Sequence, residues 1–259
     1  MLFRSNNFGK TGLTFTARYT LSQTKDNVSS AFQDAPQAQY QLGFTDTYNP
    51  GLDRGFADFD VRHRFVSSFN YEPKFLEGHS GVSKHLLGGW SLNGTFTVRS
   101  GSPFTIFDCT LRNAVCARLL QSAPVTINSD PPDTGDPNSF RLVDLSNQTL
   151  RVPAGGNGLI SNYNFGPFPA SMSARNAFRG PGGWDTTAGL FKKIHFTERV
   201  SVQLRAEVFN LFNHANLYVD SSSPDVSGVI GSGNVLATRG TNNGTQERRN
   251  VQLAAKIIF

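Results

Sequence analysis

The sequence predicts an all-β fold, an antiparallel transmembrane β-barrel segment with about six long strands and long external loops. Apolar and polar residues alternate with a period of two in six separate segments, which is typical of strands that have one apolar face. The last of these segments ends on the terminal aromatic residue Phe259. No stretch approaches the ~20 apolar residues that a membrane-spanning helix needs. A bilayer would therefore be crossed by strands.

The composition favours strands and turns over helices. The chain of 259 residues holds 25 Gly, 13 Pro and 22 Phe but only 2 Met, and aromatic residues are enriched in strands while Gly and Pro mark turns. The formal net charge is +5, but the Lys and Arg residues are scattered and form no basic run. We therefore expect no nucleic-acid partner.

Six strands are expected at about 11–23, 60–72, 88–99, 184–196, 199–212 and 247–259. On these boundaries each strand has about 12 to 15 residues, more than the 5–6 residues usual in soluble proteins. That length is enough to cross a bilayer at a tilt. A soluble β-sandwich is the alternative, and it would fold without detergent.

The connections between these strands alternate between short and long. Such alternation is typical of outer-membrane barrels, which have short periplasmic turns and long external loops. The longest loop, about 100–183, contains Cys109 and Cys116, either a small disulfide loop in an oxidising compartment or two unpaired thiols. The Asp-rich stretch 129–137 lacks the spacing of a known calcium loop, so we expect a solvated turn there.

No catalytic constellation is found. The motifs H-E-x-x-H, G-x-S-x-G and G-x-x-x-x-G-K are absent from the sequence. The 5 His residues fall in different segments without the spacing of metal ligands. We therefore expect no enzyme activity, no cofactor and no metal site.

Charged residues recur on the polar side of the predicted strands, where they would face the lumen of a barrel. They are either a basic lining that attracts an anionic solute or pairs with a plug, or a solvated and mutually neutralised wall. The candidate lumen-facing charges are Arg18, Arg62, Arg64, Arg99, Lys193, Arg205, Glu207 and Lys256, and Asp185 lies on the same side. At the end of the fifth strand, the aromatics of 209–213 favour an interfacial girdle over a ligand-binding role.

Five phrases resemble a known family. Together they look like the C-terminal part of Oar-like TonB-dependent outer-membrane transporters of the acidobacterial type. The phrases are DFDVRHRF (58–65), LLGGWSLNG (86–94), SGSPF (100–104), RNAFRGPG (175–182) and RAEVFNLFNH (205–214).

This resemblance implies a barrel of about 22 strands that encloses a plug, located in the cell outer membrane. It implies active uptake of a large, scarce solute, driven by the inner-membrane energy-coupling complex. Residues 1–259 would be the C-terminal part of that barrel, without the signal peptide, the carboxypeptidase-regulatory-like domain and the plug. The alternative is a surface-binding or adhesion barrel that transports nothing.

The resemblance also implies the partners of such a barrel. These are outer-membrane lipid, the missing N-terminal strands with the plug, and the outer-membrane assembly machinery. In that family a terminal aromatic residue preceded by alternating apolar residues is the signal that this machinery reads. The matching positions are Val251, Leu253, Ala255, Ile257 and Phe259.

Overall fold

The computed structural model describes thirteen stretches of the chain. They are residues 2–5, 12–29, 44–46, 48–74, 82–108, 117–118, 126–127, 139–144, 173–197, 200–214, 216–219, 234–239 and 248–259. Apart from one short α-helix and one 3-10 turn, the elements in these stretches are strands. The expected all-β, antiparallel fold is confirmed.

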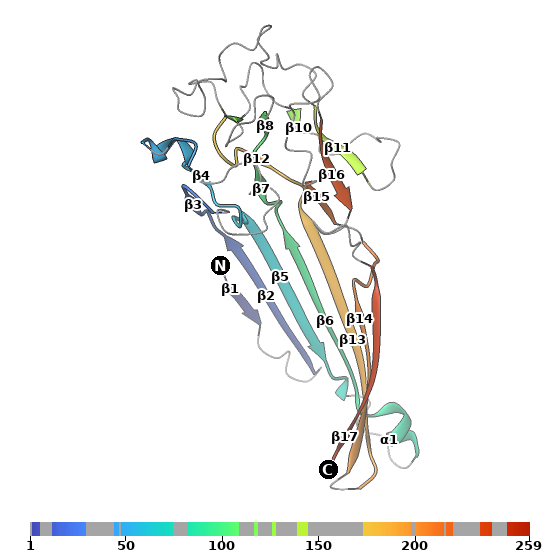
Figure 1. Ribbon diagram of the computed structural model, residues 1–259. Coiled ribbons are helices and arrows are strands. Elements are labelled where there is room, and N and C mark those ends of the chain that lie inside the picture. Colours follow the sequence, from blue (N-terminus) through green and yellow to red (C-terminus); the bar gives the residue numbers. More distant parts are fainter. Residues whose placement is uncertain are drawn as a thin grey trace.

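One long antiparallel sheet dominates the molecule (Figure 1). Its seven strands are hydrogen-bonded in the order of the chain, β1-β2-β5-β6-β13-β14-β17. They are β1 (Leu2–Ser5), β2 (Leu13–Leu21), β5 (His63–Tyr71), β6 (Trp90–Arg99), β13 (Gly183–His195), β14 (Ser201–Phe209) and β17 (Asn250–Ile258). Five of the six expected segments contain one of these strands, the expected segment 184–196 matches β13 with an offset of one residue, and β1 was not anticipated.

The strands are shorter than expected. Most have 9 or 10 residues and only β13 reaches 13. Apolar alternation continues past the last ladder partner, as at Phe196 after β13. The alternating pattern in the sequence is therefore longer than the segment that forms ladder hydrogen bonds.

Short and long connections alternate along the sheet. The strand ends that the segments 6–12, 72–89 and 196–200 join lie at one end of the sheet, and those that the longer segments 22–62, 100–182 and 210–249 join lie at the other. Figure 1 shows the C-terminus, the C-terminal end of β13 and α1 (Val82–Leu87) at the lower end. Among the described residues, no helix is long and apolar enough to span a membrane.

Small elements gather above the upper end of the sheet (Figure 1). Two-stranded pairs join β3 to β4, β7 to β12 and β8 to β9, and a four-stranded sheet has the order β10-β11-β16-β15. Their bounds are β3 (Lys25–Asp26), η1 (Pro50–Asp53), β4 (Gly55–Phe56), β7 (Pro103–Phe104), β8 (Phe107–Asp108), β9 (Ala117–Arg118), β10 (Thr126–Ile127), β11 (Ser139–Asp144), β12 (Phe178–Arg179), β15 (Leu217–Val219) and β16 (Asn234–Arg239).

The register places every predicted apolar set on one face of the large sheet. Leu190 pairs with Leu92 on one side and with Ala206 on the other, and Ala206 pairs with Leu253. Directly opposed residues share a face, so these pairs extend one apolar face across four strands. The same parity continues to Phe15, which pairs with Phe69.

This apolar face is open to the surroundings. Leu253 is 77% exposed, Leu204 45% and Leu92 39%. The buried apolar side chains of the described residues lie elsewhere, namely Ala57, Phe104, Ile106 and Phe178. All four belong to the segments above the sheet, so the packed core is at its upper end.

Candidate functional site

Three arginines and four aspartates form a largely buried cluster of four ion pairs above the sheet. We call it the rim cluster, and it consists of Asp26, Asp53, Asp58, Asp60, Arg118, Arg175, Asn176 and Arg179. These residues come from distant parts of the chain, since Arg175 and Asp26 are separated by 149 positions. The cluster fixes the segments of two long upper connections against each other.

Arg118 and Asp53 form its most buried pair. Arg118 Nη1 lies 2.5 Å from Asp53 Oδ1, and the two side chains are 3% and 0% exposed. Arg118 also donates to the carbonyl oxygens of Ser173 and Leu52, at 2.8 and 2.9 Å. The backbone N–H of Thr45 donates to the second oxygen of Asp53 at 2.7 Å. A buried charge needs such pairing and hydrogen bonding to be tolerated.

Arg175 and Asn176 join the middle of the cluster. Arg175 donates to the carbonyl oxygen of Asp53 at 2.8 Å and forms ion pairs with Asp26 and Asp58. Asn176 has a positive φ of 54°, which Asn tolerates better than most residues. Its side-chain amide donates to Asp58 Oδ1 at 2.5 Å. These two residues hold a tight turn against the segment 53–58.

Arg179 and Asp60 form the fourth ion pair of the cluster, which adjoins the large sheet. The Arg179 guanidinium also lies over the ring of Phe56, 4.9 Å from its centroid. Burial by itself would raise the pKa of Asp60. The hydrogen bonds from Arg179 and from the backbone N–H of Thr24, with the charges of Arg179 and Arg62, outweigh burial and lower this pKa.

Paired strands bring the arginine-bearing turn to its position. In β7 and β12, Phe104 pairs with Phe178, and their ring centroids are 5.8 Å apart. A Cβ added at Gly101 would lie 1.8 Å from the carbonyl oxygen of Gly180, so only glycine permits this approach. The phrases 58–65, 100–104 and 175–182 thus meet at the rim cluster.

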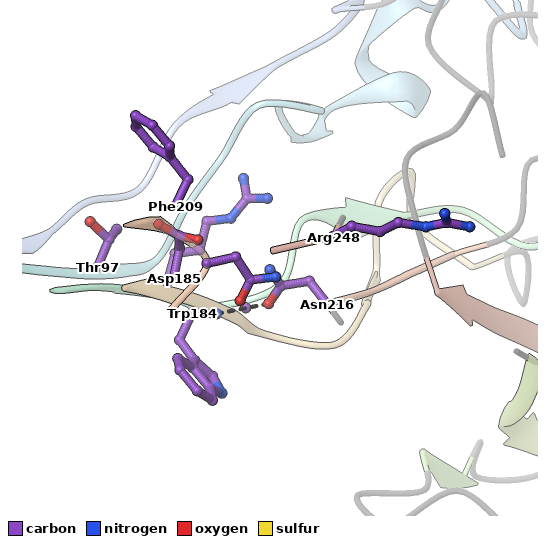
Figure 2. Close-up of a pocket in the computed structure, with 9 residues that line it drawn as sticks. Thr97, Trp184, Asp185, Phe209, Asn216 and Arg248 are labelled. Carbon is purple, nitrogen blue, oxygen red and sulfur yellow. Dashed lines mark hydrogen bonds between the residues drawn. The ribbon is translucent and has the colours of Figure 1, made fainter. Parts of the chain in front are cut away.

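A cavity of about 410 Å³ lies on the polar face of the sheet near its upper end. In Figure 2, Thr97, Asp185 and Phe209 project to one side of the sheet, and Trp184 projects to the other. The lining residues are Thr97, Arg99, Gly183, Trp184, Asp185, Phe209, Asn210, Asn216 and Arg248.

Two buried asparagines hold the cavity wall in place. Asn216 Oδ1 accepts a hydrogen bond from the backbone N–H of Trp184 at 2.9 Å (Figure 2). Asn210, at a φ of 51°, donates to the His214 carbonyl oxygen at 2.7 Å and accepts from the His214 N–H at 2.8 Å. The phrase 205–214 therefore ends in a tight turn whose geometry its own asparagine sets.

Aromatic rings cluster on the opposite, apolar face at the same height. Trp184 stacks on His214 with centroids 4.2 Å apart, and Phe212 and Phe96 lie 5.9 and 6.2 Å from it. A belt of aromatic rings at the end of an exposed apolar face is typical of a membrane interface.

A family model described as an outer membrane beta barrel domain matches residues 5–252. The chain belongs to this outer-membrane β-barrel family. No curated protein and no solved structure matches the chain. The protein is therefore located in the outer membrane, where the exposed apolar face of the sheet contacts lipid and the polar face lines the barrel interior.

Several candidate lumen-facing charges lie on that polar face. By register, Arg64 opposes Arg99, Lys193 opposes Gln203, and Gln203 opposes Lys256. Arg18, Arg205 and Glu207 have the same parity, and Arg62 lies just outside β5, where it donates to the Ser22 carbonyl oxygen at 3.4 Å. The structure does not bring these charges together at one site. Only Arg99 lines the cavity, together with Asp185.

The aromatics at the end of β14 divide between the two faces. Phe212 packs against Trp184 on the lipid face, as an interfacial girdle requires. Phe209 instead lines the cavity on the polar face, so the expected common girdle is wrong for this residue. The shared parity of Phe209, Glu207 and Arg205 along β14 was the signal for its orientation.

The apolar positions 251, 253, 255 and 257 of the expected assembly signal share the lipid face in β17, and Phe259 follows the strand. Cys109, Cys116 and the stretch 129–137 lie outside the described residues. Sequence reasoning missed the rim cluster. The phrases 58–65 and 175–182 contain two of its four acids and two of its three arginines, but the sequence of neither phrase indicates which residues it contacts.

Proposed function

We propose that the chain is the C-terminal part of a TonB-dependent transporter that takes up a large, scarce solute through the outer membrane. The resemblance of the five phrases supports this, and three of them, 58–65, 175–182 and 205–214, contribute residues to the rim cluster or to the cavity wall. The protein works without catalysis, and its own chemistry is binding.

The direction of the edge strands carries the argument for a large barrel. The seven strands alternate in direction along an antiparallel sheet, so β1 and β17 run the same way. They cannot pair with each other in an antiparallel barrel, and identical copies in the same orientation meet the same obstacle. An odd number of further strands must separate them. An unpaired edge in hydrocarbon costs several kcal/mol for each exposed backbone group.

Strands that precede β1 in a longer polypeptide satisfy this requirement. We propose that they come with a plug domain, that the energy-coupling complex of the inner membrane drives transport, and that the assembly machinery recognises β17. A surface-binding barrel without transport is the second candidate. It is favoured by the rim cluster, which stabilises external segments without using the interior.

Native outer membranes test the proposal. An antibody against the segment 248–259 should detect a polypeptide several times larger than the 28.3 kDa of this chain, and mass spectrometry should find plug peptides in the same band. The purified polypeptide should bind the periplasmic domain of the energy-coupling protein. A large barrel that lacks plug peptides and does not bind this domain would favour the surface-binding candidate.

A further inference from the structure

The charged residues around the cavity are not neutralised by one another. Arg99, Asp185 and Arg248 are exposed and line one space. Within the described part of the chain, no ion pair joins any of them to an opposite charge. We propose that this cavity binds a solute that carries an oxyanion, a carboxylate or phosphate group, beside an apolar portion.

The basic side of the cavity favours an oxyanion. Arg99 lies directly opposite Arg64 in the β5–β6 ladder, and like charges in directly opposed positions destabilise a sheet. Arg248 adds a further positive charge to the lining. A bound oxyanion offsets this repulsion, and the guanidinium fork matches the geometry of carboxylate and phosphate oxygens.

Phe209 provides the apolar side. Its ring is 42% exposed on the face of β14 that otherwise carries Gln203, Arg205 and Glu207. An exposed ring inside a hydrated barrel gains free energy when a solute covers it. The apolar portion of the solute therefore packs on Phe209.

Asp185 makes the site selective. Asp185 pairs with Thr97 in the β6–β13 ladder. Arg99 lies two residues further along β6 and is the diagonal neighbour of Asp185 on the same face. The Asp185 carboxylate accepts hydrogen bonds only. Close to the bound oxyanion it favours hydroxyl or amine groups on the solute and disfavours a second negative group.

The site is held ready for binding by the bonds of Asn210 and Asn216 described above. A volume of about 410 Å³ is at the lower end of the range for small-molecule sites, roughly 300–1,000 Å³. It accommodates a small solute or one end of a larger one. The role of this site in uptake rests on the proposed function, whereas binding itself requires no energised membrane.

Calorimetric titration of the full-length protein, purified from outer membranes in detergent, tests the inference. The probes are phenyl phosphate and benzoate, with inorganic phosphate and phenol as fragments that each lack one half of the expected chemistry. At least one oxyanion probe should bind more tightly than either fragment. No binding of both oxyanion probes at millimolar concentration would overturn the inference.

Variants then locate the binding. Arg99→Gln should lower the affinity for the bound oxyanion probe about tenfold or more. Phe209→Ala should lower the affinity for the same probe without changing the affinity for inorganic phosphate. Asp185→Asn should leave affinity unchanged or raise it, while Lys256→Gln, on the polar face outside the cavity, serves as the matched control. Wild-type affinity in Arg99→Gln would overturn the assignment. The titration measures equilibrium binding and requires no energised membrane. Absence of binding would therefore refute this site without refuting transport, and absence of transport would refute the proposed function without refuting this site.

Discussion

The Arg118 guanidinium and the Asp53 carboxylate form an ion pair of 2.5 Å that is almost wholly buried and joins residues 65 positions apart. The pair closes the rim cluster at the point where η1 meets β9. External segments of a barrel have no lipid to pack against, and here paired charges and backbone hydrogen bonds hold them.

Removal of one partner should release the outer segments. Asp53→Asn leaves the Arg118 guanidinium buried without its counter-charge, which typically costs about 3–5 kcal/mol. We expect faster proteolytic cleavage of the segment 44–60 in folded protein, with the barrel itself intact. Arg54→Gln, at the exposed neighbouring position, is the control. Equal cleavage rates in both variants would show that the pair does not hold the rim.

Acid should weaken the rim through Asp60. Its pKa is lower in the folded protein than in the unfolded chain because the bonds and charges around it outweigh its burial. Its stabilising contribution is therefore complete above the unfolded value of 3.8 and is lost as the pH falls through the lower folded value. Unfolding midpoints measured from pH 6 to 2 should fall less steeply in Asp60→Asn than in the wild type. Parallel profiles would contradict this.

Lys192 should anchor α1 to the sheet. Although it belongs to the apolar face, it is only 7% exposed, and its Nζ donates to the carbonyl oxygens of Leu86 and Gly88 and lies 5.0 Å from the Trp90 ring centroid. Lys192→Met loses these charge-assisted bonds, a loss of about 1–3 kcal/mol, and should shift Trp90 fluorescence. Lys193→Gln, the exposed neighbour on the polar face, should change neither quantity. Similar effects of the two variants would refute the anchor.

The two faces of β17 should respond differently to a charge. Leu253 faces lipid and Gln252 faces the interior, so Leu253→Arg should cost up to about 2–4 kcal/mol near the bilayer midplane while Gln252→Arg costs little. The measurement is the yield of folded barrel in the outer membrane, read from its heat-modifiable gel mobility. Equal yields would contradict the assignment of the faces.

Period-two alternation was sufficient to predict the large sheet because each strand carries its own signal. In β14 the run from Val200 to Val208 marks both the strand and its faces, and the register in β13 and β17 follows the same parity. The signal failed where it was too brief, as in the four residues of β1. The alternation also failed to predict the strand ends, because the ladder hydrogen bonds of a strand end where its neighbouring strand ends.

The rim cluster was unpredictable for a different reason. Arg118 and Asp53 have no periodic relation, and their contact depends on how two long connections fold over the barrel mouth. Three of the phrases that indicated the family also meet there, so their residue types follow from contacts with each other. Phe209 shows that residue type alone is also insufficient. Its aromatic ring is typical of an interfacial girdle, but its parity along β14 places it on the polar face.

The central claim, that one face of this sheet contacts lipid and the other lines a hydrated barrel, is tested most directly along β6. Single cysteines at Leu92, Asn93, Thr95 and Phe96, in a background with Cys109 and Cys116 replaced by Ser, would carry spin labels in the membrane-embedded full-length protein. Relaxation by oxygen, which enters lipid, should dominate at 92 and 96, and relaxation by a water-soluble nickel chelate should dominate at 93 and 95. Equal access of the chelate to all four positions would contradict the account.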